Sequence, residues 1–117
     1  MALPELYAAV GGDYPNVLER LGDEQTIQYF VLRYLNDPSY EDLRRWLREK
    51  DMKQAFYAAH TLKGVTQSLG FGRLGRCAST LCEELRKGTV PSDDLLQQLE
   101  TEYRGVIAAI QEWQNER

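Results

Sequence analysis

The apolar residues of this chain recur at intervals of three and four, and this spacing constrains the fold more than any other feature. Such spacing gathers apolar side chains on one face of an α-helix. It predicts helical segments at about residues 2–10, 13–21, 24–36, 40–50, 51–70, 72–87 and from 92 almost to the C-terminus. Because short connections between long amphipathic helices favour antiparallel neighbours, we expect an all-α fold. Its form should be an antiparallel up-down four-helix bundle with extra short N-terminal helices, in one domain spanning residues 1–117.

Helix boundaries follow from capping and breaking residues. The chain has breaks at Gly11-Gly12, Gly22, Asp37-Pro38 and Gly70, and N-cap candidates at Asp13, Asp23, Ser39, Asp51 and Ser92. The segment that Asp23 begins has a clear three-four spacing. Its residues predicted to face the core are Ile27, Phe30, Val31, Tyr34 and Leu35.

The only histidine lies within the segment from Asp51 to Gly70. An α-helix turns by about 100° per residue, so each side chain of this segment can be assigned to a face. The predicted core stripe comprises Ala55, Ala58, Ala59, Leu62, Val65, Thr66 and Leu69. His60, Gly64 and Gln67 fall on the opposite face, at about 140–200° from Leu62. The histidine is therefore expected to point away from the core.

This placement favours phosphoryl chemistry at His60. Gly64, one turn later, adds no side chain and leaves open space beside the imidazole. Lys63 places an ammonium near the same surface, where it can neutralise an anion held at the ring. Imidazole nitrogen is nucleophilic near neutral pH. The pattern suits a histidine that accepts and passes on a phosphoryl group.

The run Ala59-His60-Thr61-Leu62-Lys63-Gly64, followed by Ser68-Leu69-Gly70-Phe71, resembles the signature of histidine-containing phosphotransfer (HPt) domains. The resemblance is strongest over residues 57–87. It implies that His60 is phosphorylated, that Lys63 is its charge partner and that Gly64 lets a receiver domain approach. Ser68 occupies the place of a small polar residue that forms hydrogen bonds near the site.

The residues beside the histidine allow more than one reading. Phe56, Tyr57 and Thr61 are candidates for contacting a partner, although packing against a neighbouring helix is the favoured role of Phe56 and is an equal alternative for Tyr57. Gln67 is either a hydrogen-bond partner of the imidazole or phosphate, or an exposed polar residue. Whether apolar residues between positions 3 and 21 join the docking rim is left open.

By the resemblance, the protein is a phosphoryl carrier of a two-component phosphorelay and not a self-contained enzyme. Its expected partners are response-regulator receiver domains or a hybrid histidine kinase, acting in trans because the bundle uses the whole chain. No cofactor or metal is expected on this chain, whereas Mg²⁺ is expected on the receiver. The direction of phosphoryl flow stays open.

Composition limits which partners and which cellular compartment are expected for the protein. The 117 residues carry a formal net charge of −4 without a Lys/Arg-rich run, which argues against nucleic-acid binding. No apolar run is long enough to cross a membrane and no signal-peptide pattern is present. Cys77 and Cys82 lack metal-ligand spacing and are badly placed to pair. We therefore expect a cytoplasmic protein, and a monomer.

Two other classes of protein compete with this interpretation. One is a helical interaction module in which the surface histidine is inert. The other is a small acid–base enzyme that uses His60, although no Ser, Cys or carboxylate stands at an obvious motif spacing to form a dyad or triad. A phosphate-binding regulator is a weaker third possibility.

Overall fold

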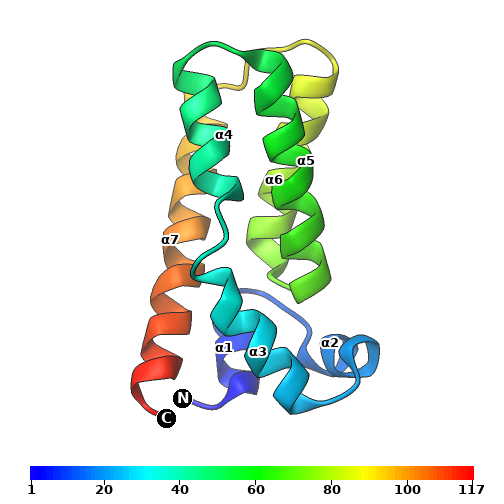
Figure 1. Ribbon diagram of the computed structural model, residues 1–117, viewed down its shortest axis with the longest axis vertical. Helices are drawn as coiled ribbons and strands as arrows, with labels where there is room; N and C mark the ends of the chain where they lie inside the picture. Colours follow the sequence, from blue (N-terminus) through cyan, green and yellow to red (C-terminus); the bar gives the residue numbers. More distant parts are fainter.

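The computed structural model of the chain describes all 117 residues and is entirely helical (Figure 1). Its helices are α1 (Leu3–Ala9), α2 (Tyr14–Leu21), α3 (Glu24–Tyr34), α4 (Ser39–Arg48), α5 (Met52–Leu69), α6 (Gly72–Arg86) and α7 (Asp93–Asn115). The all-α class expected from the apolar spacing is confirmed.

Helices α4 to α7 form an antiparallel up-down bundle (Figure 1). Helix α5 packs against α4 on one side and α6 on the other, and α6 packs against α7. The rings of Tyr40 in α4 and Tyr103 in α7 stack with centroids 3.8 Å apart, which joins the first and last helices of the bundle. The expected four-helix architecture is therefore confirmed.

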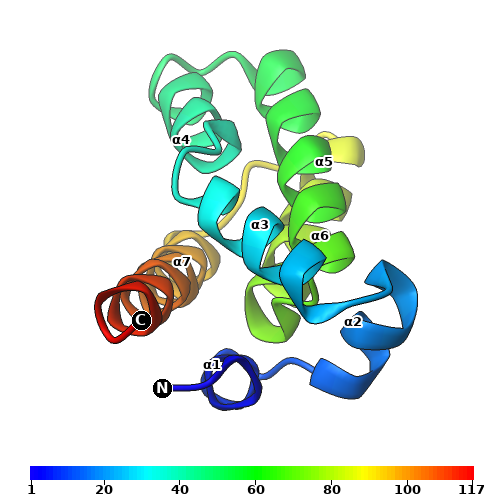
Figure 2. The ribbon, with the colours of Figure 1, turned by 60° about the horizontal axis from the view of Figure 1, so that its bottom comes forward.

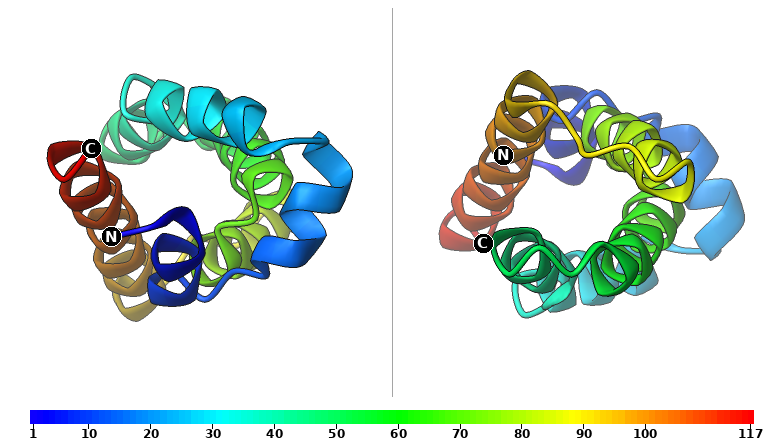
Figure 3. Two further views of the ribbon diagram at one scale, coloured as in Figure 1. Left: turned by 90° about the horizontal axis from the view of Figure 1, so that it is seen from below. Right: turned by 90° about the horizontal axis from the view of Figure 1, so that it is seen from above.

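The three N-terminal helices gather at the end of the bundle where both termini lie (Figures 1 and 2). Helix α3 leads into α4, α1 packs against α7, and α2 lies at the periphery (Figure 3). One hydrophobic core of 25 buried residues draws on all seven helices. The N-terminal helices are thus part of the same core as the bundle.

The ends of α5 are fixed by the residues that the sequence indicates. The Asp51 carboxylate accepts a hydrogen bond from the Gln54 amide at 3.1 Å, as an N-cap does. Gly70 ends the helix in the left-handed conformation, with φ of 78°, which glycine adopts at little cost. In addition, the Tyr7 hydroxyl donates to the Leu69 carbonyl at 2.7 Å. Helix α1 is thereby tied to the end of the histidine-bearing helix.

Two details of the sequence interpretation are wrong. Ser39 is the first residue of α4 and does not cap it; the Asp37 carboxylate accepts from both the amide and the hydroxyl of Ser39. Asp37 lies just before Pro38, at the bend between α3 and α4. Phe30, predicted to face the core, is 40% exposed, because α3 packs through Ile27 and Val31 and turns Phe30 outwards.

Candidate functional site

His60 lies near the middle of α5 with its side chain in solvent. The adjacent Ala59 and Leu62 are both fully buried, so the expected orientation of this helix is confirmed. The imidazole forms no hydrogen bond within the chain, and its nearest aromatic neighbour is Phe56, with ring centroids 6.1 Å apart. Both ring nitrogens are therefore free to react or to bind.

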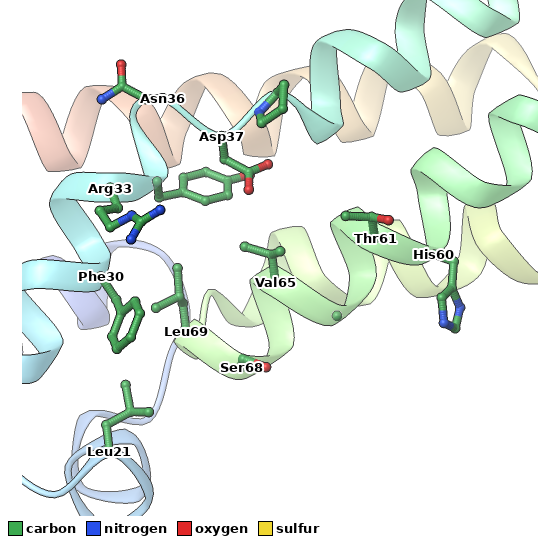
Figure 4. Close-up of a pocket in the computed structure, with 13 residues that line it drawn as sticks. Leu21, Phe30, Arg33, Asn36, Asp37, His60, Thr61, Val65, Ser68 and Leu69 are labelled. Carbon is green, nitrogen blue, oxygen red and sulfur yellow. The ribbon is translucent and has the colours of Figure 1, made fainter.

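A groove of about 900 Å³ runs along α5 from His60 (Figure 4). One wall is α5 itself, and the facing wall comes from the end of α2, from α3 and from the link to α4. The residues that line it are Leu21, Phe30, Arg33, Tyr34, Asn36, Asp37, Pro38, His60, Thr61, Gly64, Val65, Ser68 and Leu69. His60 stands at the end of the groove away from Leu21 and Phe30 (Figure 4).

Gly64 keeps the approach to the imidazole open. A Cβ atom built at this position would have no neighbour within 4 Å, so the surface beside His60 is clear of side chains. Glycine in a helix interior costs about 1 kcal/mol relative to alanine. Packing within the chain does not account for this cost, because no neighbouring segment comes close enough to require a glycine here.

Four of the eight residues predicted for the site line the groove: His60, Thr61, Gly64 and Ser68. The Thr61 hydroxyl donates back to the Tyr57 carbonyl at 3.1 Å. Tyr57 is 52% exposed and lies outside the groove. Phe56 is half-buried against the core, as packing between helices requires.

Lys63 and Gln67 lie on the side of α5 that faces α6. The hydrogen bond from Arg86 lowers the pKa of the Glu83 carboxyl, and the charge of Lys63 adds a smaller effect in the same direction. The Lys63 ammonium forms no hydrogen bond or ion pair, so it is free to turn towards His60, three residues earlier on the helix. The backbone carbonyl of Gln67 accepts a hydrogen bond from Arg20 of α2 at 3.5 Å.

The facing wall of the groove was not predicted as part of the site, except that a place in the docking rim was left open for apolar residues between positions 3 and 21, a range that includes Leu21. Phe30 and Leu21 supply apolar surface, and Arg33 supplies a positive charge. The Arg33 guanidinium lies 5.5 Å from the centre of the Tyr29 ring and donates to the Tyr29 hydroxyl at 2.9 Å. The three-four spacing of α3 carries no signal that would separate Phe30 from the buried residues.

Tyr34 closes the floor of the groove. It is 2% exposed, and its hydroxyl has no hydrogen-bond partner. Burial raises the pKa of Tyr34, and the neighbouring Tyr103 and Asp37 add to the effect. The phenol therefore stays neutral.

The fold and the site define a class of protein: a four-helix bundle that presents a single exposed histidine beside an open groove. The family model of the Hpt domain matches residues 37–113, a range that contains α4 to α6, the histidine and all but the last two residues of α7. The chain therefore belongs to the Hpt domain family. No match was found among curated proteins or among solved structures.

Membership of this family implies histidine phosphotransfer within a phosphorelay, in which Hpt domains act as phosphoryl carriers. None of the helices is long and apolar enough to cross a membrane. No group of three or more His, Cys, Asp or Glu side chains is arranged to hold a metal ion.

Proposed function

We propose that His60 is the phosphoacceptor, which takes a phosphoryl group from the aspartyl phosphate of a receiver domain and returns it to a receiver aspartate. An unprotonated ring nitrogen of His60 attacks phosphorus. The new N–P bond forms as the P–O bond to the aspartate breaks, and the carboxylate leaves. The reverse step restores the imidazole and forms the acyl phosphate on the second receiver.

The observation that supports this proposal best is the free imidazole at the end of an open groove. Phosphoryl transfer depends mainly on positioning and on neutralising charge. The clear surface at Gly64 leaves room for the receiver to bring its aspartyl phosphate in line with the ring nitrogen. Mg²⁺ bound by the receiver supplies charge that this chain lacks.

Lys63 is the proposed charge partner of the phosphorylated histidine. A phosphoryl group on a side chain carries about −1.5 to −2 charges, and Lys63 has no competing ion pair. Gln67 and Ser68, both about two turns beyond His60, offer further hydrogen bonds to the phosphate or to the receiver.

The 117 residues are proposed to act together as one Hpt domain. A carrier must release each partner, so we expect a transient interface of less than about 1,200 Å². Both cysteines are free thiols, which fits the reducing cytoplasm in which receivers and kinases meet.

The deciding experiment follows phosphoryl transfer from a panel of phosphorylated receiver domains of the same organism. Wild-type protein should gain an acid-labile, alkali-stable label, and His60→Gln should gain none. Circular dichroism should show that the variant is folded, since His60 is exposed and forms no hydrogen bond. A folded wild type that gains no label from any receiver would favour an interaction module with an inert histidine. Turnover of a small substrate without a receiver would favour an enzyme.

The role of Lys63 has its own test. Lys63→Ala should slow transfer by about tenfold, which corresponds to 1.4 kcal/mol, because the ammonium neutralises charge that the phosphate brings. Lys53→Ala is the matched control: it removes an exposed lysine of the same helix, two turns before His60. If the two variants transfer at the same rate, Lys63 is not the charge partner.

A further inference from the structure

The two walls of the groove come from different parts of the chain. The α5 wall, with His60 and Gly64, lies inside the region that matches the Hpt family. Leu21, Phe30 and Arg33 of the facing wall come before residue 37 and lie outside it. The α5 wall can therefore carry the chemistry that the family shares. The facing wall can carry contacts that differ from one member of the family to another.

Phe30 is an unusual residue to leave in solvent. It is a large aromatic side chain, 40% exposed, on a helix whose Ile27 and Val31 are fully buried. Tyr29 is 55% exposed and contacts Phe30 edge-on, with ring centroids 5.3 Å apart. Burying such rings against a partner would gain free energy that burial in the chain's own core does not supply.

Arg33 adds a positive charge to this apolar surface. Its guanidinium is exposed and forms no ion pair, although the hydrogen bond to Tyr29 restricts its position. A guanidinium held in this way favours a carboxylate opposite it. The chain as a whole is acidic, with a formal net charge of −4, so a cation at this rim is a local feature.

We propose that Leu21, Phe30 and Arg33 form a selectivity wall that decides which receiver delivers its phosphoryl group to His60. The selected receiver presents an apolar side chain to Phe30 and Leu21 and a carboxylate to Arg33. This inference rests on the proposed function. Because His60 and this wall line the same groove, a receiver that docks along the groove contacts both.

Helix α2 is held where the wall requires it. The Arg20 guanidinium donates to the Ser68 carbonyl at 3.0 Å and to the Asn16 side chain at 2.9 Å. The bond to Ser68 fixes the end of α2 against the C-terminal turn of α5, whereas the bond to Asn16 lies within α2 and orients the guanidinium. Leu21 follows directly, and it thereby faces the groove instead of solvent.

The experiment measures transfer from each receiver of the same panel to wild type, Phe30→Ala and Arg33→Glu. With the preferred receiver, kcat/KM should fall about tenfold in each variant, mainly through a higher KM. With poorly matched receivers kcat/KM should change less than twofold. The ratio of kcat/KM between the preferred and the poorly matched receivers should therefore fall. Phosphorylation of His60 by phosphoramidate, a small donor that needs no docking, should keep the wild-type rate.

Two exposed residues outside the groove provide controls. Val90→Ala removes apolar surface that is 68% exposed, in the link between α6 and α7. Arg48→Glu reverses an exposed charge at the end of α4. Both should leave the ranking of receivers unchanged.

The outcomes separate this inference from the proposed function. If the wild type accepts phosphoryl groups and the Phe30 and Arg33 variants keep the same preference, the selectivity wall is wrong and the carrier function stands. If loss of phosphoramidate labelling accompanies the loss of transfer, the variants disturb His60 itself and the wall is again wrong. If no receiver labels the wild type, both proposals fail.

Discussion

At the scale of single residues, the site depends on what surrounds one imidazole. His60 is exposed beside an open surface, and Gly64 keeps that surface free of side chains. A second glycine of the chain has the same open space around it. Gly64 in α5 and Gly105 in α7 both lie inside helices, and a Cβ atom at either would meet nothing within 4 Å. They differ in that only Gly64 lies beside His60.

This comparison gives a prediction for Gly64. Gly64→Ala and Gly105→Ala should each raise the free energy of unfolding by about 0.5–1 kcal/mol, because alanine is the better helix former and has room at both positions. Urea unfolding measures this. Gly64→Gln should slow transfer from a receiver at least tenfold while the protein stays folded, because its side chain fills the approach to the imidazole.

Gly105→Gln is the matched control and should transfer at the wild-type rate. A Gly64→Gln variant that transfers as fast as wild type would show that the cleared surface is not needed. The glycine would then have no explanation in the structure.

At the scale of helices, glycines at the turn between α5 and α6 allow these helices to pack closely against the N-terminal helices. Gly70 ends α5 and Gly72 is the first residue of α6, and both lie next to the link between α1 and α2. A Cβ atom at Gly72 would overlap the carbonyl group of Gly11, and one at Gly12 would overlap the carbonyl oxygen of Gly70. The two links pack backbone to backbone because side chains are absent from both.

Gly72→Ala should therefore have the opposite sign from Gly64→Ala. We expect the free energy of unfolding to fall by about 1–3 kcal/mol, as for other overpacked sites, because the added methyl group meets a backbone that cannot move aside. Thermal and urea unfolding of Gly72→Ala and Gly105→Ala together provide the check. A Gly72→Ala variant as stable as wild type would mean that the two links are free to separate.

At the scale of the whole molecule, the region that matches the family is smaller than the unit that is packed. The match begins at residue 37, yet Leu6 and Tyr7 of α1 and Ile27 and Val31 of α3 are fully buried in the common core. Each fully buried apolar side chain contributes about 1.5–3 kcal/mol. Residues 1–36 are thus expected to be required for folding.

A protein of residues 37–117 tests this expectation. We expect the full chain, with its one core, to unfold in a single cooperative transition, and the truncated protein to lose it. The truncated protein should also bind a dye that reports exposed apolar surface, because removal of α1 to α3 uncovers the core. Scanning calorimetry and dye fluorescence measure both effects. A truncated protein that melts as sharply as the full chain would show that residues 37–117 are an independent domain.

Much of the site could be predicted from the sequence, since its determinants are local. The turn of an α-helix fixes which side chains share a face, so the exposure of His60 and Gly64 followed from spacing alone. Asp51, Asp23 and Ser92 cap helices as expected, because a cap bonds to amides only two or three residues away. The family resemblance rested on the same short segment.

Tertiary structure decided which residues line the groove opposite α5. Packing depends on how helices are rotated and crossed, and the spacing of residues within one helix does not specify the rotation or the crossing. The apolar spacing of α3 did not distinguish Phe30 from Ile27, and only packing turned one outwards. Leu21 reached the groove because Arg20 bonds to α5, 47 and 48 residues away in sequence. The sequence alone determined which face of α5 exposes His60; the fold supplied the wall across the groove, since its residues are brought there by contacts distant in the chain.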